Sequence, residues 1–166
     1  MAAGSTYTPL ATTTLGSNQA SYTFSSIAGT YTDLILVISG KHSANSNEGF
    51  GLQFNSDTGS NYSSTILRAN AGTAYSTRAS NQTRLIAGWL NVTDIGVYIN
   101  HIQNYSNTTT YKTVISNGAQ INTNTYNSIS ASLWRSTSAI TSITVIPDAA
   151  SLATGMTLTL YGIAAA

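Results

Sequence analysis

The segment "MTLTLYGI", residues 156–163, alternates apolar and polar side chains along most of its length. In an extended strand Met156, Leu158 and Leu160 would share one face, and threonine and tyrosine side chains would share the other. This period of two is typical of a half-buried antiparallel strand that turns its apolar face toward a core. The pattern recurs in "FGLQFN" (50–55), "SISASLW" (128–134) and "TSITVIP" (141–147).

The segment "DLILVIS", residues 33–39, is apolar on both faces. It predicts a central strand that is covered on one side by the core and on the other by a neighbouring element or a partner subunit. No window carries a sustained helical period, although residues 148–155 could form one helical turn. Weaker strand patterns lie near residues 7–14, 20–25, 61–68, 84–91, 95–103 and 111–117.

The strand patterns together predict the fold class. About ten short strands, separated by clusters of Gly, Asn, Asp, Ser and Thr, are typical of an all-β protein. We expect an antiparallel two-sheet β-sandwich with a jelly-roll-like arrangement. The 166 residues suit one domain with its own core, so we expect a single domain over residues 1–166. Within it, residues 1–8 could form an extended N-terminal arm.

The chain carries little charge. Charged residues make up 7% of it and the formal net charge is +1, whereas about 25% is usual in soluble domains. Such a chain offers no basic stripe to a nucleic acid and gains little from repulsion between copies, which favours a place inside an assembly. The absence of cysteine excludes disulfides and thiolate chemistry. We find neither a secretory signal nor an apolar run of helical membrane-spanning length, so no membrane insertion is expected.

Residues 57–60, Asp-Thr-Gly-Ser, match the sequence around the catalytic aspartate of aspartic proteases. That chemistry needs two carboxylates that share a proton, and the chain contains no second Asp-Thr-Gly or Asp-Ser-Gly. Asp and Gly are common turn residues, because Asp bonds the nearby backbone and Gly adopts positive φ. The segment therefore predicts a hairpin turn rather than a protease site.

The two histidines, His42 and His101, do not indicate a zinc site, because such a site needs at least a third protein ligand. We expect His42 in a surface loop and His101 hydrogen-bonded on a strand face. The chain has no EF-hand spacing, nucleophile elbow, phosphate-binding loop or dinucleotide-binding fingerprint. No catalytic residue, cofactor or metal site is therefore predicted.

The ten tyrosines are the remaining candidates for recognition. Tyr62, Tyr105, Tyr111 and Tyr126 lie in or beside polar segments, as does Tyr75. Tyrosine is a good strand residue, and it is also common at subunit interfaces and on sugar-binding platforms. We take Tyr62, Tyr105, Tyr111 and Tyr126 as candidates for glycan or subunit contact.

Four segments, in this order, carry a resemblance to a known family. They are "AGSTYTPLATTTLGSNQASYTFSSIAGTYTDLILVISG" (3–40), "LQFNSDTGSNYSSTIL" (52–67), "RASNQT" (78–83) and the closing "MTLTLYGI". Together they resemble a family of small structural proteins of tailed bacteriophages, especially marine and cyanobacterial phages. The resemblance implies a β-rich virion protein, either a separate chain or a module of a fibre-like protein. It implies no chemistry, so no functional residue is carried over.

Two functions follow as expectations. The first is a non-enzymatic capsid decoration or cement protein, made in the host cytoplasm and located on the capsid surface of the virion. Its partners would be the major capsid protein and other copies of itself, with a homotrimer as the expected oligomer by analogy with other jelly rolls. The alternative is the receptor- or glycan-binding tip of a tail or head fibre, with a host surface glycan as partner. Scarce acidic residues argue against a glycan hydrolase, which needs two converging carboxylates.

Overall fold

The computed structural model describes residues 6–44, 48–70, 72–120 and 126–164. These residues form strands, turns and loops, with no helix among them, and residues 148–155 do not form the helical turn that their sequence allows. The strands are β1 (Tyr7–Thr14), β2 (Tyr22–Phe24), β3 (Asp33–Gly40), β4 (Glu48–Phe54), β5 (Tyr62–Asn70), β6 (Thr73–Gln82), β7 (Leu85–Leu90), β8 (Gly96–Gln103), β9 (Lys112–Gln120), β10 (Tyr126–Trp134), β11 (Ile143–Pro147) and β12 (Thr157–Ile163).

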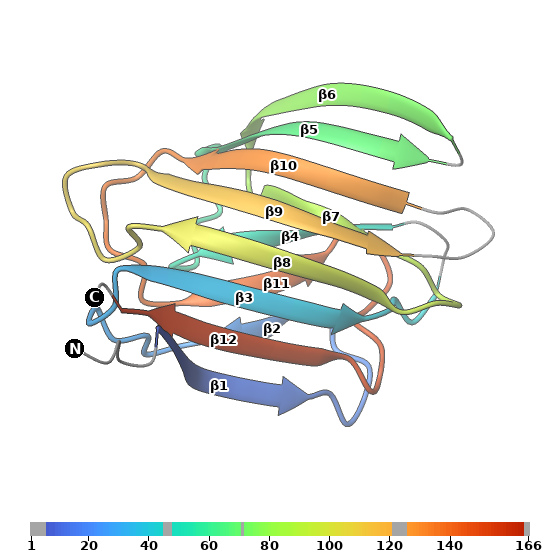
Figure 1. Ribbon diagram of the computed structural model, residues 1–166, viewed down its shortest axis with the longest axis horizontal. Coiled ribbons are helices and arrows are strands. Elements are labelled where there is room, and N and C mark those ends of the chain that lie inside the picture. Colours follow the sequence, from blue (N-terminus) through green and yellow to red (C-terminus); the bar gives the residue numbers. More distant parts are fainter. Residues whose placement is uncertain (1–5, 45–47, 71, 121–125, 165–166) are drawn as a thin grey trace.

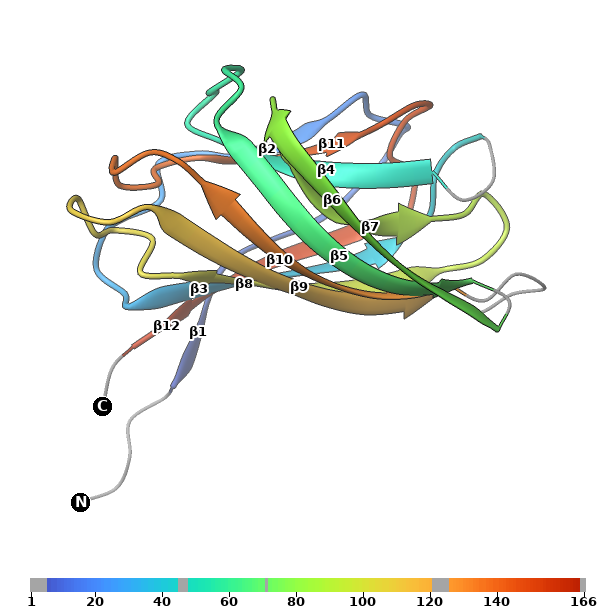
Figure 2. The ribbon, with the colours of Figure 1, turned by 90° about the horizontal axis from the view of Figure 1, so that it is seen from above.

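The strands form two stacked antiparallel sheets (Figures 1 and 2). The large sheet has eight strands in the order β1-β12-β3-β8-β9-β10-β5-β6, and the small sheet has four in the order β2-β11-β4-β7. The predicted all-β sandwich is therefore confirmed. The strand β3, predicted from "DLILVIS", lies inside the large sheet between β12 and β8.

Eight of the strands form a jelly roll. The antiparallel pairs β1/β12, β2/β11, β3/β8 and β4/β7 join early strands to late ones in reverse order, and successive pairs alternate between the two sheets. This is the arrangement of a long two-stranded ribbon rolled into a sandwich. We call these eight strands the roll. The other four, β9, β10, β5 and β6, continue the large sheet beyond β8, and we call them the extension.

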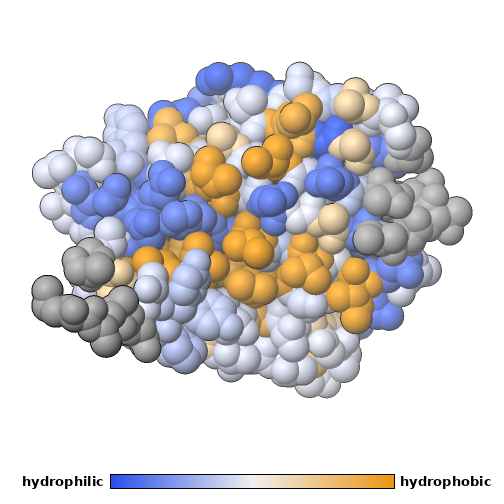
Figure 3. All heavy atoms as spheres, in the orientation of Figure 1, coloured by the Kyte–Doolittle hydropathy of each residue, from blue (hydrophilic) through white to orange (hydrophobic). Residues whose placement is uncertain are grey.

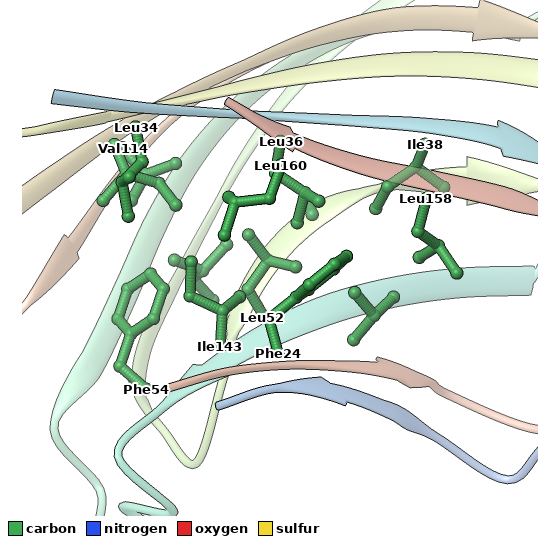
Figure 4. Packing of buried hydrophobic residues seen from close by; sticks show 14 of the residues in the cluster. Phe24, Leu34, Leu36, Ile38, Leu52, Phe54, Val114, Ile143, Leu158 and Leu160 are labelled. Carbon is green, nitrogen blue, oxygen red and sulfur yellow. The ribbon is translucent and has the colours of Figure 1, made fainter. Parts of the chain in front are cut away.

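The core of the roll follows the predicted alternation. Leucines of β3 and β12 on the inner face of the large sheet point toward Phe24, Leu52, Phe54 and Ile143 of the small sheet (Figure 4). All of these side chains are buried. Full burial of one such side chain contributes about 1.5–3 kcal/mol, so this layer is a major source of the stability of the sandwich.

In β10 the expected orientation of the two faces is wrong. Its serines Ser128, Ser130 and Ser132 are buried against the small sheet, whereas Ile129 is 47% exposed on the outer face. The segment is a strand with period two, as predicted, but its polar face points inward. The reason is the close approach of β7, which packs over β8, β9, β10 and β5.

Small inner side chains allow this approach and hydrogen-bond the backbone of β7. The Ile86 backbone N–H donates to Ser64 Oγ (3.0 Å), and Ser130 Oγ donates to the Ile86 carbonyl oxygen (3.1 Å). Ser132 Oγ donates to Ser64 Oγ (2.8 Å) and completes the network. A Cβ added at Gly88 of β7 would lie 2.4 Å from the Tyr98 ring, so a larger residue would not fit. Serine hydroxyls thus satisfy backbone groups at an edge of the small sheet.

The strand β6 was not predicted. Its sequence, "TAYSTRASNQ", has no apolar alternation, and nearly all of its residues are exposed. It forms because it pairs with β5 along most of its length, after a turn in which Gly72 has a φ of 86°. The strand therefore depends on its neighbour rather than on burial of its own side chains.

The predicted N-terminal arm is partly wrong. Tyr7 and Thr8 belong to β1 and pair with Ile163 and Gly162 of β12, so these two residues are part of the large sheet. Residues 1–5 of the predicted arm lie outside the described residues.

Candidate binding surfaces

The Asp-Thr-Gly-Ser segment is a turn between two strands, as predicted, but it is not a hairpin. It connects β4 of the small sheet to β5 of the large sheet, so the chain crosses from one layer to the other. Asn55 and Ser56 both have positive φ, and the Asp57 N–H donates to the Phe54 carbonyl oxygen (2.9 Å). A hairpin would have required β4 and β5 to be neighbours in one sheet.

The Asp57 carboxylate holds this crossing in place. It accepts hydrogen bonds from Trp134 Nε1 (2.7 Å), Asn61 Nδ2 (2.9 Å) and the Gly59 backbone N–H (2.8 Å). Burial acts to raise the pKa of Asp57, but these three hydrogen bonds outweigh it and leave the pKa below its usual value. Asp57 is therefore an ionised acceptor that ties the turn to β10.

The two histidines differ from each other in their surroundings. His101 is hydrogen-bonded on a strand face, as predicted, with its Nε2 2.9 Å from Asp33 Oδ2. The expectation of a surface position for His42 is wrong, because its side chain is buried and Nε2 donates to the Glu48 carbonyl oxygen (3.1 Å). Burial lowers the pKa of His42, which favours the neutral imidazole in the folded protein.

Tyr62 and Tyr105 are not contact residues. Both are fully buried, so the prediction that they touch a glycan or another subunit is wrong. Tyr62 Oη accepts from the Phe54 N–H (3.0 Å), and burial together with the nearby Asp57 charge raises the pKa of Tyr62 to about 12. Tyr105 Oη donates to the Ala28 carbonyl oxygen. The two tyrosines stand beside polar segments because they anchor those segments to the core.

Tyr111 and Tyr126 remain candidates. Tyr111 is 53% exposed, and Tyr126 is half-buried with its hydroxyl accepting from Asn70 Nδ2 (2.7 Å). They lie at opposite ends of the extension. Tyr126 is the first residue of β10. Tyr111 directly precedes β9, and the first residue of β9 pairs with Trp134 at the far end of β10. The structure therefore does not bring the four candidate tyrosines into one patch.

The outer face of the large sheet carries an apolar surface that sequence reasoning missed. Val97, Ile99, Ile129 and Leu67 are each between 45% and 55% exposed. In the register of the sheet, Ile129 is directly opposite Leu67 across β10 and β5, and Ile99 is opposite Val37 across β8 and β3. Figure 3 shows apolar side chains gathered across the middle of this face. The outer apolar band consists of Val37, Val97, Ile99, Ile115, Ile129, Ala131 and Leu67.

Two shallow depressions lie within the part of the band on the extension. One, of about 260 Å³, lies between Leu67, Ile115, Ile129 and Ala131. The second, of about 230 Å³, shares Leu67 and Ile129 with the first and continues toward Asn127. Because the two depressions are contiguous, the extension offers a hollowed apolar surface rather than isolated exposed side chains.

A second feature missed from the sequence lies on the inner side of the extension. The Arg68 guanidinium of β5 lies over the Trp89 ring of β7, 4.7 Å from its centroid, and over the Tyr75 ring of β6, at 5.3 Å. Both distances are within the range of cation–π attraction. The residues are 21 positions apart at most, but no motif links them, so only the packing of β7 against the extension reveals the cluster.

A third opening lies between the edge strands β1 and β2 of the two sheets. Its volume is about 400 Å³, and Leu10, Tyr22, Phe24 and Tyr31 are among the residues that line it. Apart from its two tyrosines the lining contains no ionisable side chain. Its size suits a small ligand, but its chemistry does not single out one class of ligand.

Comparison with protein-family models and with curated proteins finds no match to this chain. Within the described ranges, no three His, Cys, Asp or Glu side chains come together as a metal site would require. No helix in the same ranges is long and apolar enough to cross a membrane.

Proposed function

We propose that this chain is a non-enzymatic structural protein of a bacteriophage virion, acting as a capsid decoration or cement protein on the outside of the head. In this role it forms homo-oligomers, with a trimer as the expected state, and contacts the major capsid protein. The resemblance of the sequence to phage structural proteins supports the assignment to a virion. The outer apolar band is the surface that we propose makes the contacts.

The observation that carries the proposal is the orientation of β10. Its three serines are buried while Ile129 is about half exposed, directly opposite the equally exposed Leu67. Exposed apolar patches with shallow hollows are typical of protein–protein contact sites. A chain with 7% charged residues also places little charge between two such surfaces. These features support an assembly function more than a freely diffusing one.

The size of the outer face fits a stable contact. Eight strands spaced about 4.8 Å apart, with strands such as β3 and β8 eight residues long, give a face of roughly 900 Å². A standard interface buries about 800 Å² on each partner. A partner covering most of this face would therefore bury enough area for specific binding.

The first test is the position of the protein on purified virions. We expect many copies spread over the head, measured by quantitative mass spectrometry and by antibody-gold labelling. A few copies at the tail, or at one vertex, would contradict the decoration function and support a fibre tip.

The second test concerns the contact surface. The double variant Leu67→Asp with Ile129→Asp places two charges on the outer apolar band, and both positions are exposed enough to tolerate them. By analytical ultracentrifugation, wild type should form oligomers and the variant should not. Thr23→Asp, at an exposed position on β2 of the small sheet, is the matched control and should assemble normally. Wild type that stays monomeric and does not bind capsids would refute the proposal.

The alternative function, a receptor- or glycan-binding fibre tip, is favoured by one observation. The cluster of Arg68, Trp89 and Tyr75 places a cation and two aromatic rings together on the side of the extension opposite the band. Position on the virion separates this function from the first.

A further inference from the structure

The inner face of the extension is partly uncovered. In Figure 1 the strands of the small sheet lie behind the middle of the large sheet, and none lies behind β6. Thr73, Tyr75 and Thr77 alternate along β6, so they share the inner face, and all three are exposed. This face therefore offers a strip of hydroxyl groups beside Arg68, which pairs with Tyr75 across β5 and β6.

The Arg68 guanidinium is oriented by two aromatic rings. The rings of Trp89 and Tyr75 hold it, and its Nε atom is buried without a hydrogen-bond partner among the described residues. The ion pairs found within those residues are Arg84–Asp148 and His101–Asp33, so no carboxylate neutralises Arg68 there. A buried donor without an acceptor is costly, and a guanidinium is well suited to receive a carboxylate in a two-bond fork.

Asn70 lies on the same strand and face as Arg68, opposite the exposed Thr73 of β6. Its Nδ2 donates to Tyr126 Oη (2.7 Å), while its buried Oδ1 has no donor. Arg68 and Asn70 are two residues apart on β5, which places them about 7 Å apart along the strand. That spacing is comparable to the width of one sugar ring. The exposed Thr73 hydroxyl opposite Asn70 can donate to or accept from a hydroxyl group of a ligand.

We propose that Arg68, Thr73 and Tyr75 form a binding site for an acidic saccharide, such as a uronic acid residue of a polysaccharide. Arg68 binds the sugar carboxylate, the exposed Thr73 hydroxyl bonds a ring hydroxyl, and the partly exposed Tyr75 ring lies beside the sugar. This site deepens the alternative function, which rests on the same cluster, and it does not depend on the outer apolar band, which is on the opposite face of β5.

The surroundings favour a saccharide over an acidic peptide. The exposed neighbours on β6 are threonines, which can donate to and accept from several hydroxyls at once. None of them forms an apolar pocket that would recognise a peptide side chain. A sugar uses hydroxyls, a carboxylate and a ring face together, and the cluster presents a partner for each.

The test uses an oligomer of galacturonic acid as the probe, with its methyl ester as the matched neutral ligand. We expect saturable NMR shifts at the Trp89 indole N–H and at Arg68 Nε–H with the acid, and none with the ester. Trp134 is the internal control, because its indole is buried and bonded to Asp57 at the other end of the extension. N-acetylglutamate, which carries carboxylates but no sugar, tests whether the site binds an acidic peptide side chain instead.

Variants assign the binding to Arg68. Arg68→Gln should weaken binding of the acidic oligomer about ten-fold or more, because it removes a charge-assisted fork. Arg68→Lys keeps the charge without the planar fork and should also weaken binding. Arg78→Gln, on the exposed strand β6, is the matched control and should bind like wild type.

Three results would overturn the proposal. They are the absence of saturable shifts at Trp89 in wild type, unchanged binding by Arg68→Gln, and binding of N-acetylglutamate as tight as that of the sugar oligomer. The last would assign the site to protein carboxylates instead. The wild-type shifts decide the matter even if Arg68→Gln does not fold, and none of these outcomes bears on assembly through the outer apolar band.

Discussion

The strands β12 and β10 carry the same alternation of side chains but use it in opposite ways. In β12, Leu158 and Leu160 point into the core and the polar residues point outward. In β10, Ser130 and its serine neighbours point inward while Ile129 points outward. The difference lies in what covers each strand. β12 belongs to the roll, whose core is apolar, whereas β10 lies under the backbone of β7, which needs small hydrogen-bonding partners.

This comparison teaches that period and polarity carry different information. A period of two establishes a strand, because successive side chains point to opposite faces. Which face is buried depends on the layer packed against it. In the extension the layer is a single edge strand at close range, and the apolar face is left exposed.

The largest expected effect is a cavity in the roll. Leu36→Ala on β3 removes a fully buried side chain and should lower the free energy of unfolding by about 2–5 kcal/mol. Urea unfolding followed by tryptophan fluorescence measures it. Ile129→Ala, the matched aliphatic truncation in the extension, should cost far less. Equal losses at the two positions would mean that Ile129 is buried and the comparison is wrong.

A smaller effect is expected when the serine network is broken. Ser64→Ala leaves the Ile86 N–H without its acceptor and removes the partner of Ser132, which should cost about 1–3 kcal/mol of unfolding free energy. Thr65→Ala, at the next and exposed position, is the control and should change stability little. A neutral Ser64→Ala would show that the hydroxyls do not hold β7 to the extension.

The pH dependence of stability tests the burial of His42, which lies just after β3 of the roll. Burial lowers the pKa of His42 from its usual 6.5, and backbone hydrogen bonds and the charges of Glu48 and Asp148 oppose this without cancelling it. The unfolded chain then takes up a proton at higher pH than the folded chain. Stability is therefore full above about pH 6.5 and falls as the pH decreases toward the folded-state pKa.

Melting temperatures measured from about pH 8 to about pH 5 test this. The decrease toward acid should be shallower in His42→Gln than in wild type, while His101→Gln should keep the decrease that comes from His42. If His42→Gln showed the wild-type slope, another group would be responsible for the acid sensitivity.

The smallest effect on the single chain is expected on the outer apolar band. Leu67→Ser and Ile129→Ser should each change the free energy of unfolding by no more than about 0.5 kcal/mol when measured on dilute monomer. At higher concentration the same variants should lose association. Destabilisation of the monomer by several kcal/mol would place these side chains in a core instead of a contact surface.

Much of the fold could be predicted from local patterns, and the exceptions have physical reasons. The strands β4, β11 and β12 of the roll alternate clearly because each has one face in the apolar core. β6 was missed because it is exposed on both faces and so shows no alternation. The Asp-Thr-Gly turn was recognised, but its path between the sheets was not, because a turn sequence does not specify which sheet receives the next strand.

The candidate residues were harder to predict than the fold. Tyr62 and Tyr105 looked exposed because polar residues surround them in the sequence. In the structure Tyr62 packs against Phe54 and Trp134 in the core, and the buried Tyr105 bonds the backbone of Ala28. Arg68 and Trp89 were not selected because neither belongs to a motif. Their pairing exists because β7 ends close to β5 across the two layers.

The sequence by itself determined that the chain is an all-β protein with little charge and no thiol chemistry. Composition and a period of two can be read without knowing which strand pairs with which, or which sheet packs against it. Only the tertiary structure decided which face of the extension is apolar and open, where Arg68 finds its rings, and that His42 is buried. The reason is that strand pairing brings together residues far apart in the chain. Burial then depends on the layer above each strand and not on the strand alone.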